Sequence, residues 1–253
     1  KTILVYIVIL SLVDVEKNME FEANCTVPKM IQATAEKYPE IVAQYTKNKS
    51  GDCEPITYRE MFQKGMDFGA ALLNMGVKRE QPIGLISDNR AEWQHADLGL
   101  LSIGAIDVPR GCDATIVDLE KILSITECEI VIAENNSQVN KILSIKDKLP
   151  VVKKIIHFEN DIKDEVRADA SSKNVELYYF QDLLVEGQKW RITNKNVVEK
   201  KKKKGNSDDL ATYIFTSGTT GTPKGVMLTH RNFLAQLDEI PERIYLNPGD
   251  KGI

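Results

Sequence analysis

Hydroxyl groups, glycines and one lysine gather in residues 213–226 of this 253-residue chain. Glycine lets the backbone adopt positive φ angles and approach a ligand closely, because it has no Cβ atom. Ser and Thr hydroxyls donate hydrogen bonds to phosphate oxygens, and a lysine adds a full positive charge. The segment therefore predicts a polyphosphate-binding loop. Its candidate binding residues are Thr216, Ser217, Gly218, Thr219, Thr220, Gly221, Lys224 and Gly225.

The spacing within this segment differs from that of the P-loop nucleotide triphosphatases, which have G-x-x-x-x-G-K-[ST] at the start of a helix. Five residues separate Gly218 from Lys224, Pro223 replaces the second glycine, and Gly225 replaces the Ser or Thr that would hold magnesium. A different class of phosphate loop is indicated.

Apolar runs on both sides of the loop predict two strands. Residues 210–215 form one run and residues 226–228 form the other. Segments rich in Gly, Ser and Thr are most often flexible loops, which is the alternative interpretation. The arrangement of strand, loop and strand favours phosphate binding instead.

The loop resembles that of the adenylate-forming superfamily, which includes acyl-CoA synthetases, luciferases and the adenylation domains of peptide synthetases. The run T-S-G-T-T-G-x-P-K-G-V is intact in residues 216–226. Residues 208–212 before it and 227–232 after it resemble the long-chain fatty acyl-CoA synthetase branch. Upstream, residues 88–93, 96–99 and 104–109 look like the first strand-helix-strand unit of that family.

This resemblance implies ATP-dependent activation of a fatty acid to an acyl adenylate, followed by transfer of the acyl group to coenzyme A. ATP and Mg²⁺ are the implied cofactors, coenzyme A is the co-substrate, and no metal ligand is identified in this sequence. The family's magnesium carboxylate, ribose-binding aspartate, adenylation lysine and small carboxy-terminal domain would follow Ile253. We therefore expect an amino-terminal part of such a ligase that is inactive alone. The alternatives are a ligase for amino acids or aryl acids, and a non-catalytic nucleotide-binding remnant.

Two further positions bear on the site. His230 occupies the position where the family's T-H-x-N begins a helix, so its imidazole is a candidate for contact with phosphate or with the acyl carboxylate; the alternative is a structural histidine at a helix start. Arg110 and Gly111 stand where an aromatic residue is usual in the family, so contacts at this turn cannot be transferred from it. Trp93 and Asp97, one helical turn apart, are interpreted as a core residue and a structural acceptor.

The composition and net charge of the chain argue against a nucleic-acid partner. The chain has 42% hydrophobic and 28% charged residues, a net charge of -4 and a pI near 5.6, which gives no basic field for a nucleic-acid backbone. Its cysteines lie far from any C-x-x-C pair and the three histidines do not cluster with them, so a zinc site and a disulfide framework are not expected. We expect a cytoplasmic protein, with peripheral membrane association left open.

Residues 1–18 form an apolar extension before the family-like sequence in residues 19–253. Residues 3–13 resemble a signal-peptide core but fall short of the roughly 20 apolar residues that cross a membrane. Three interpretations remain: non-native upstream sequence, a membrane anchor lying in the interface, and an ordered edge strand.

The hydrophobic pattern predicts the α/β class, with a mostly parallel sheet flanked by helices. Before this pattern, Pro28 to Tyr38 predicts a helix, and Thr57 with Glu60 predicts a capping box for a helix ending near Gly76. Residues 160–174 are expected to be a solvated excursion, and residues 195–207, with their lysine run, a linker. Strands are predicted for residues 83–87, 106–109, 130–133, 154–158 and 176–180, and helices for residues 91–103, 115–126 and 137–149.

Overall fold

The computed structural model describes residues 24–47, 50–216 and 224–243, with side-chain surroundings up to residue 236. Residues 1–18 lie outside the described residues. The elements are α2 (Val27–Lys37), β1 (Val42–Lys47), β2 (Cys53–Thr57), α3 (Tyr58–Asn74), β3 (Pro82–Ile86), α4 (Ala91–Ile103), β4 (Ile106–Arg110), α5 (Ile116–Thr126), β5 (Ile130–Ala133), α6 (Asn136–Ser144), a 3₁₀ turn (Lys146–Lys148), β6 (Lys154–His157), α7 (Asp164–Ser172), β7 (Glu176–Tyr179), α8 (Phe180–Thr193), α9 (Val197–Lys203), β8 (Leu210–Thr216), β9 (Lys224–Thr229) and α10 (His230–Arg243).

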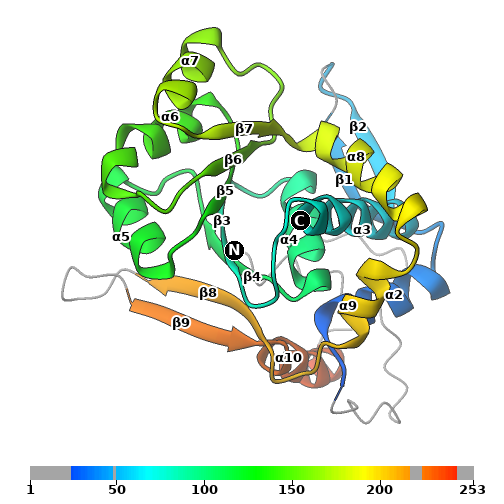
Figure 1. Ribbon diagram of the computed structural model, residues 1–253. Coiled ribbons are helices and arrows are strands. Elements are labelled where there is room, and N and C mark those ends of the chain that lie inside the picture. Colours follow the sequence, from blue (N-terminus) through cyan, green and yellow to red (C-terminus); the bar gives the residue numbers. More distant parts are fainter. Residues whose placement is uncertain (1–23, 48–49, 217–223, 244–253) are drawn as a thin grey trace.

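Seven strands form one sheet in the order β7-β6-β5-β3-β4-β8-β9 (Figure 1). Neighbouring strands from β7 to β8 are parallel, and the edge strand β9 is antiparallel to β8. Parallel neighbours need crossover connections, and helices supply them between β3 and β7. The predicted α/β class with a mostly parallel sheet is confirmed.

Helices cover both faces of this sheet. The core on one face contains α2, α3, α4, α8 and α9, and the core on the other contains α5, α6 and α7 (Figure 1). Side chains of a strand alternate between the faces, so Leu85 of β3 enters the first core and Ile86 the second. Because the strands from β7 to β8 are parallel, their carboxyl ends all lie at the same end of the sheet, which we call the carboxyl edge.

The predicted start of α3 is confirmed. The Glu60 backbone N–H donates to the Thr57 hydroxyl at 3.2 Å, and the Thr57 N–H donates to the Glu60 carboxylate at 2.8 Å. This reciprocal pair satisfies two donors that the first helical turn would leave free. The helix stops before Gly76, which takes the left-handed φ of 88° that ends many helices.

Two glycines allow close helix packing. A Cβ atom on Gly99 of α4 would lie 2.9 Å from the carbonyl oxygen of Gly65 in α3. A Cβ atom on Gly187 of α8 would lie 1.9 Å from the carbonyl oxygen of Asp67, also in α3. Both α4 and α8 therefore lie against the α3 backbone at distances that no larger residue would permit.

An acidic pair joins α4 to β4. Asp97 and Asp107 are each 2% exposed, and their buried carboxyl groups interact with each other. Burial raises the pKa of Asp97 to about 8, and burial together with the neighbouring carboxyl raises the pKa of Asp107. Asp97 was interpreted as a structural acceptor, whereas its surroundings keep it protonated as one half of a pair. Trp93 is buried, as expected for a core residue.

Two segments that were expected to be solvated contain helices. Residues 160–174 contain the helix α7, which buries Val166 and Ala170 against the sheet. The lysine run lies in α9 rather than in a solvated linker, and Lys202 is 5% exposed, with its ammonium 4.7 Å from the centre of the Phe62 ring. The long stem of lysine packs on apolar surface, and the aromatic face attracts the charge.

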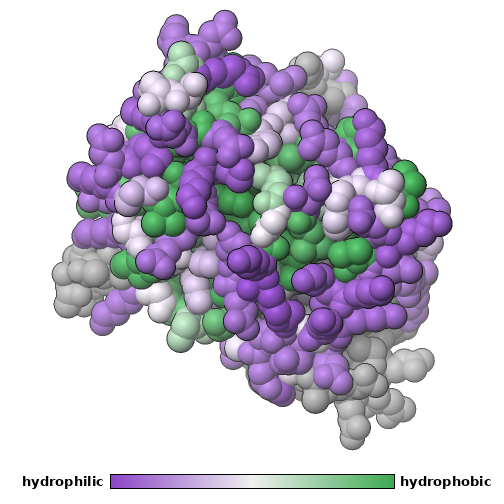
Figure 2. Space-filling view, viewed as in Figure 1, coloured by the Kyte–Doolittle hydropathy of each residue, from purple (hydrophilic) through white to green (hydrophobic). Residues whose placement is uncertain are grey.

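The sequence analysis also did not predict α8 or β2. On the surface, hydrophilic side chains dominate the face seen in Figure 2, and the exposed large apolar side chains are spread mainly over α5, α8 and β9. Within the described ranges, no helix has both the length and the apolar character needed to cross a membrane.

Candidate functional site

The two ends of the predicted phosphate loop meet at the carboxyl edge of the sheet. Thr216 ends β8, Lys224 begins β9, and the two residues are partners in the antiparallel register. Both side chains are exposed at the point where the loop begins and ends. The two strands predicted on either side of the loop are therefore present. Five candidate binding residues lie outside the described residues: Ser217, Gly218, Thr219, Thr220 and Gly221.

Gly225 has a packing role in this hairpin. It pairs with Phe215, and a Cβ atom on Gly225 would come within 3.1 Å of the Phe215 ring. Phe215 in turn is buried in the core formed with α5, α6 and α7. Glycine at this position lets the aromatic ring cover β9, which anchors the hairpin to the sheet beside Lys224.

His230 lies far from these loop ends. It begins α10, after the six-residue strand β9, so roughly 20 Å of extended chain separates it from Lys224. The residue is 3% exposed, and burial lowers the pKa of its imidazole to about 4. Its backbone N–H donates to the Asp209 carbonyl at 3.2 Å. The structure brings Thr216 and Lys224 together but does not bring His230 to them.

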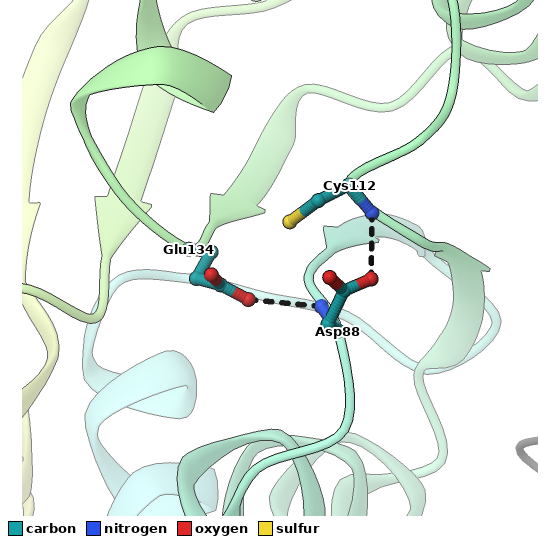
Figure 3. Close-up of side chains that lie close together, drawn as sticks. All are labelled: Asp88, Cys112 and Glu134. Atoms are coloured by element: carbon teal, nitrogen blue, oxygen red, sulfur yellow. Dashed lines mark hydrogen bonds between the residues drawn. The ribbon is translucent and has the colours of Figure 1, made fainter.

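Polar side chains follow three neighbouring strands at the same edge. Asp88 follows β3, Cys112 follows β4 and Glu134 follows β5, and their potential ligand atoms all lie within 4.8 Å of one another (Figure 3). Asp88 accepts a hydrogen bond from the Cys112 N–H at 3.0 Å, and Glu134 accepts one from the Asp88 N–H at 2.9 Å. These bonds tie the three strand ends together.

This cluster does not fit the magnesium ion that the predicted chemistry requires. Burial and the neighbouring Glu134 raise the pKa of the Cys112 thiol to about 12, so it stays protonated. Mg²⁺ prefers oxygen ligands in octahedral geometry, and a metal-bound cysteine must be a thiolate. We interpret the cluster as a structural brace and derive no step through a metal held there.

One side chain at this edge had no function assigned from the sequence. Arg110 ends β4, and its Nη1 donates to the carbonyl oxygen of Phe215 at 3.3 Å. The departure from the family pattern at Arg110 and Gly111 marked this turn as unusual. The contact itself depends on the pairing of β4 with β8, which lie more than 100 residues apart in the chain.

We compared the sequence with models of known protein families. Residues 31–252 match the family described as AMP-binding enzyme. The chain therefore belongs to the AMP-binding enzyme family.

Its relatives include fatty acid ligases. The long-chain-fatty-acid acyl-carrier-protein ligase AEE15, chloroplastic, of Arabidopsis thaliana is 29% identical over 228 residues, which cover 89% of this chain and 31% of that protein. The long-chain-fatty-acid–CoA ligase ACSBG2 of Xenopus laevis is 28% identical over 208 residues, which cover 82% of this chain and 26% of that protein. The chain thus spans about a third or less of the length of these relatives.

Among solved structures, the anthranilate CoA ligase AuaEII in complex with anthranoyl-AMP superposes with a TM-score of 0.67. The match covers 86% of this chain and 38% of that chain at 20% identity. At this identity the likeness supports the fold alone.

Proposed function

We propose that this chain supplies the phosphate-binding part of a long-chain fatty acid–CoA ligase. The observation that carries the proposal is the pairing of Thr216 with Lys224 at the carboxyl edge, where the intact T-S-G-T-T-G-x-P-K-G-V run begins and ends. Ligands of open α/β sheets bind at that edge. The fatty acid ligases among the relatives support the choice of substrate.

The reaction needs activation because a carboxylate is a poor electrophile. A carboxylate oxygen of the fatty acid attacks the α-phosphorus of ATP, and the bond from that phosphorus to pyrophosphate breaks. The acyl adenylate then has AMP as a good leaving group, and the thiol of coenzyme A displaces it with loss of its proton. Mg²⁺ accompanies ATP in the proposal, and its ligands are not assigned in this chain.

The chain's own residues act on the departing pyrophosphate. We propose that the Lys224 ammonium and the Thr216 hydroxyl hold the phosphates, that Ser217, Thr219 and Thr220 add donors, and that Gly218 and Gly221 give access. Charge builds up on pyrophosphate as the bond breaks, and one well-placed donor is worth about 3 kcal/mol in such a step. We assign His230 no part in this chemistry because it is buried at the other end of β9.

The number and spacing of the four cysteines favour a reducing compartment over a disulfide framework. We therefore propose a cytoplasmic protein. Peripheral membrane association through residues 1–18 stays a hypothesis that fractionation with and without these residues tests.

The test is the exchange of labelled pyrophosphate into ATP, made with the longest natural polypeptide that contains these residues. We expect exchange that depends on added long-chain fatty acid and not on an amino acid or an aryl acid. Exchange with either of those instead would identify a different adenylate-forming ligase. ATP binding without exchange for any acid would identify a non-catalytic nucleotide-binding protein.

A second acyl acceptor follows from the Arabidopsis relative, which is named for transfer to acyl-carrier protein. Supplying coenzyme A or acyl-carrier protein separately, after fatty acid activation, distinguishes the two. Thioester formation with coenzyme A is the expected result. Formation with acyl-carrier protein alone would move the proposal to that acceptor.

A further inference from the structure

Arg110 lies beside the strand that leads into the phosphate loop. Asp107 of β4 pairs with Thr212 of β8, so three residues further along both parallel strands Arg110 lies next to Phe215. The hydrogen bond from Arg110 Nη1 to the Phe215 carbonyl at 3.3 Å fixes the guanidinium there. Phe215 directly precedes Thr216. The positive charge thus contacts the residue that directly precedes Thr216, where the loop begins.

Most donors of this guanidinium are unused. An arginine carries five N–H donors in a rigid fork. In the described part of the chain Arg110 makes one hydrogen bond, to Phe215, and its Nε is buried without an acceptor. Buried donors are normally satisfied, so this one points to an acceptor outside the described residues, which a bound anion can supply.

The charge of Arg110 is also unpaired among the described residues. Arg79, Arg90 and Arg191 are similarly half-buried, and each has a carboxylate within ion-pair distance, but Arg110 has none. The carboxylate of Asp118 is engaged in a capping box with Thr115. That hydrogen bond and, to a smaller extent, the charge of Arg110 lower the pKa of Asp118. A half-buried cation without a carboxylate is unfavourable unless an anion binds beside it.

We propose that Arg110 binds a phosphate group of the nucleotide at the carboxyl edge of the sheet, across strand β8 from Lys224. This inference rests on the proposed function. The guanidinium fork matches the geometry of a phosphate and can donate two parallel hydrogen bonds to it. In Figure 1 the ends of β4 and β8 lie next to each other at this edge, so one polyphosphate can reach both strands. The carboxylate of the acid substrate shares this oxyanion chemistry, and the experiment separates the two.

The experiment measures the binding of ATP, pyrophosphate and palmitate by calorimetry. It uses the longest natural polypeptide that contains these residues, and Arg110→Gln and Arg110→Lys variants of it. Gln keeps a donor for the Phe215 carbonyl but loses the charge, and Lys keeps the charge but loses the fork. Arg167→Gln is the matched control, because Arg167 is an exposed arginine on α7 that has no ion pair among the described residues. Thermal unfolding of each variant shows whether it is folded.

We expect Arg110→Gln to weaken the binding of ATP and pyrophosphate by about 10- to 100-fold, as for loss of a hydrogen bond to a charged group. Arg110→Lys should recover part of this loss, and palmitate binding and the Arg167→Gln control should be unchanged. Equal ATP binding by Arg110→Gln and the unmodified protein refutes the inference and leaves the proposed function standing. Weakened palmitate binding with normal ATP binding also refutes it. If the unmodified protein binds no ATP, the proposed function fails as well.

Discussion

The buried pair of Asp97 and Asp107 makes the free energy of unfolding depend on pH in a defined direction. In the folded protein both carboxyl groups hold protons well above the ordinary aspartate pKa of about 3.9, because burial disfavours the charged form. The unfolded chain releases these protons near that ordinary pKa. Between the two values the folded state binds more protons, so its stability falls as pH rises.

The useful pH window is set by other buried groups. Burial lowers the pKa of His95 to about 3 and of His230 to about 4, so both add stability as pH rises toward 6.5 and then stop contributing. Burial also lowers the pKa of Lys202 to about 8, which adds stability above that pH. From pH 6.5 to 8 the aspartate pair is the main contributor. Each proton that the folded state retains lowers its stability by about 1.4 kcal/mol per pH unit. The histidines near pH 6.5 and Lys202 near pH 8 offset part of the effect of the two aspartates, which leaves a fall on the order of 2 kcal/mol over this window.

Urea unfolding followed by tryptophan fluorescence at pH 6.5, 7, 7.5 and 8 measures this fall. Asp97→Asn cannot ionise, so its stability should depend less steeply on pH than that of the unmodified chain. Asp147→Asn, at an exposed aspartate in the 3₁₀ turn, is the control and should keep the original slope. Stability that is flat or rising over this window, or an unchanged slope in Asp97→Asn, refutes the conclusion that these buried carboxyl groups stay protonated in the folded protein.

Two predictions concern the packing and the start of α3. Gly187→Ala should destabilise the fold by about 1–3 kcal/mol or more, because the new Cβ atom meets the Asp67 carbonyl. The control Gln188→Ala, on the exposed face of α8, should not destabilise it, and equal melting temperatures of the two variants would contradict this prediction. Thr57→Ala should cost about 1 kcal/mol through loss of the cap, and Thr57→Ser should retain most of it; equal losses in urea unfolding would show that the hydroxyl is not the cause.

Local patterns predicted much of this fold. The bounds of α4 and β5 agree with the structure, and the cap of α3 could be identified from Thr57 and Glu60 alone. These elements depend on hydrophobic periodicity and on contacts between residues close in sequence, which a sequence shows directly.

The elements that were missed depend on contacts distant in sequence. Helix α7 buries only Val166 and Ala170, so its apolar stripe is too thin to recognise. Helix α9 looked solvated because the packing of Lys202 on Phe62 joins residues 140 positions apart.

In the candidate site, too, contacts within one hairpin could be predicted, and contacts between residues distant in sequence could not. The pairing of Thr216 with Lys224 follows from one hairpin and could be predicted. The proximity of Arg110 to Phe215 requires the parallel register of β4 and β8, and the separation of His230 from the loop requires the direction of β9. Neither spatial relation can be predicted from residues close together in the sequence.

The most direct test of the central claim is pyrophosphate exchange by a Lys224→Ala variant, compared with the unmodified polypeptide of natural length. The charge of Lys224 is proposed to act on the departing pyrophosphate, so exchange should fall by about 100-fold, equivalent to about 3 kcal/mol, while fatty acid binding is retained. Lys200→Ala, at an exposed lysine of α9, is the matched control and should exchange normally. Unchanged exchange in a folded Lys224→Ala variant would contradict the assignment of this hairpin as the phosphate site.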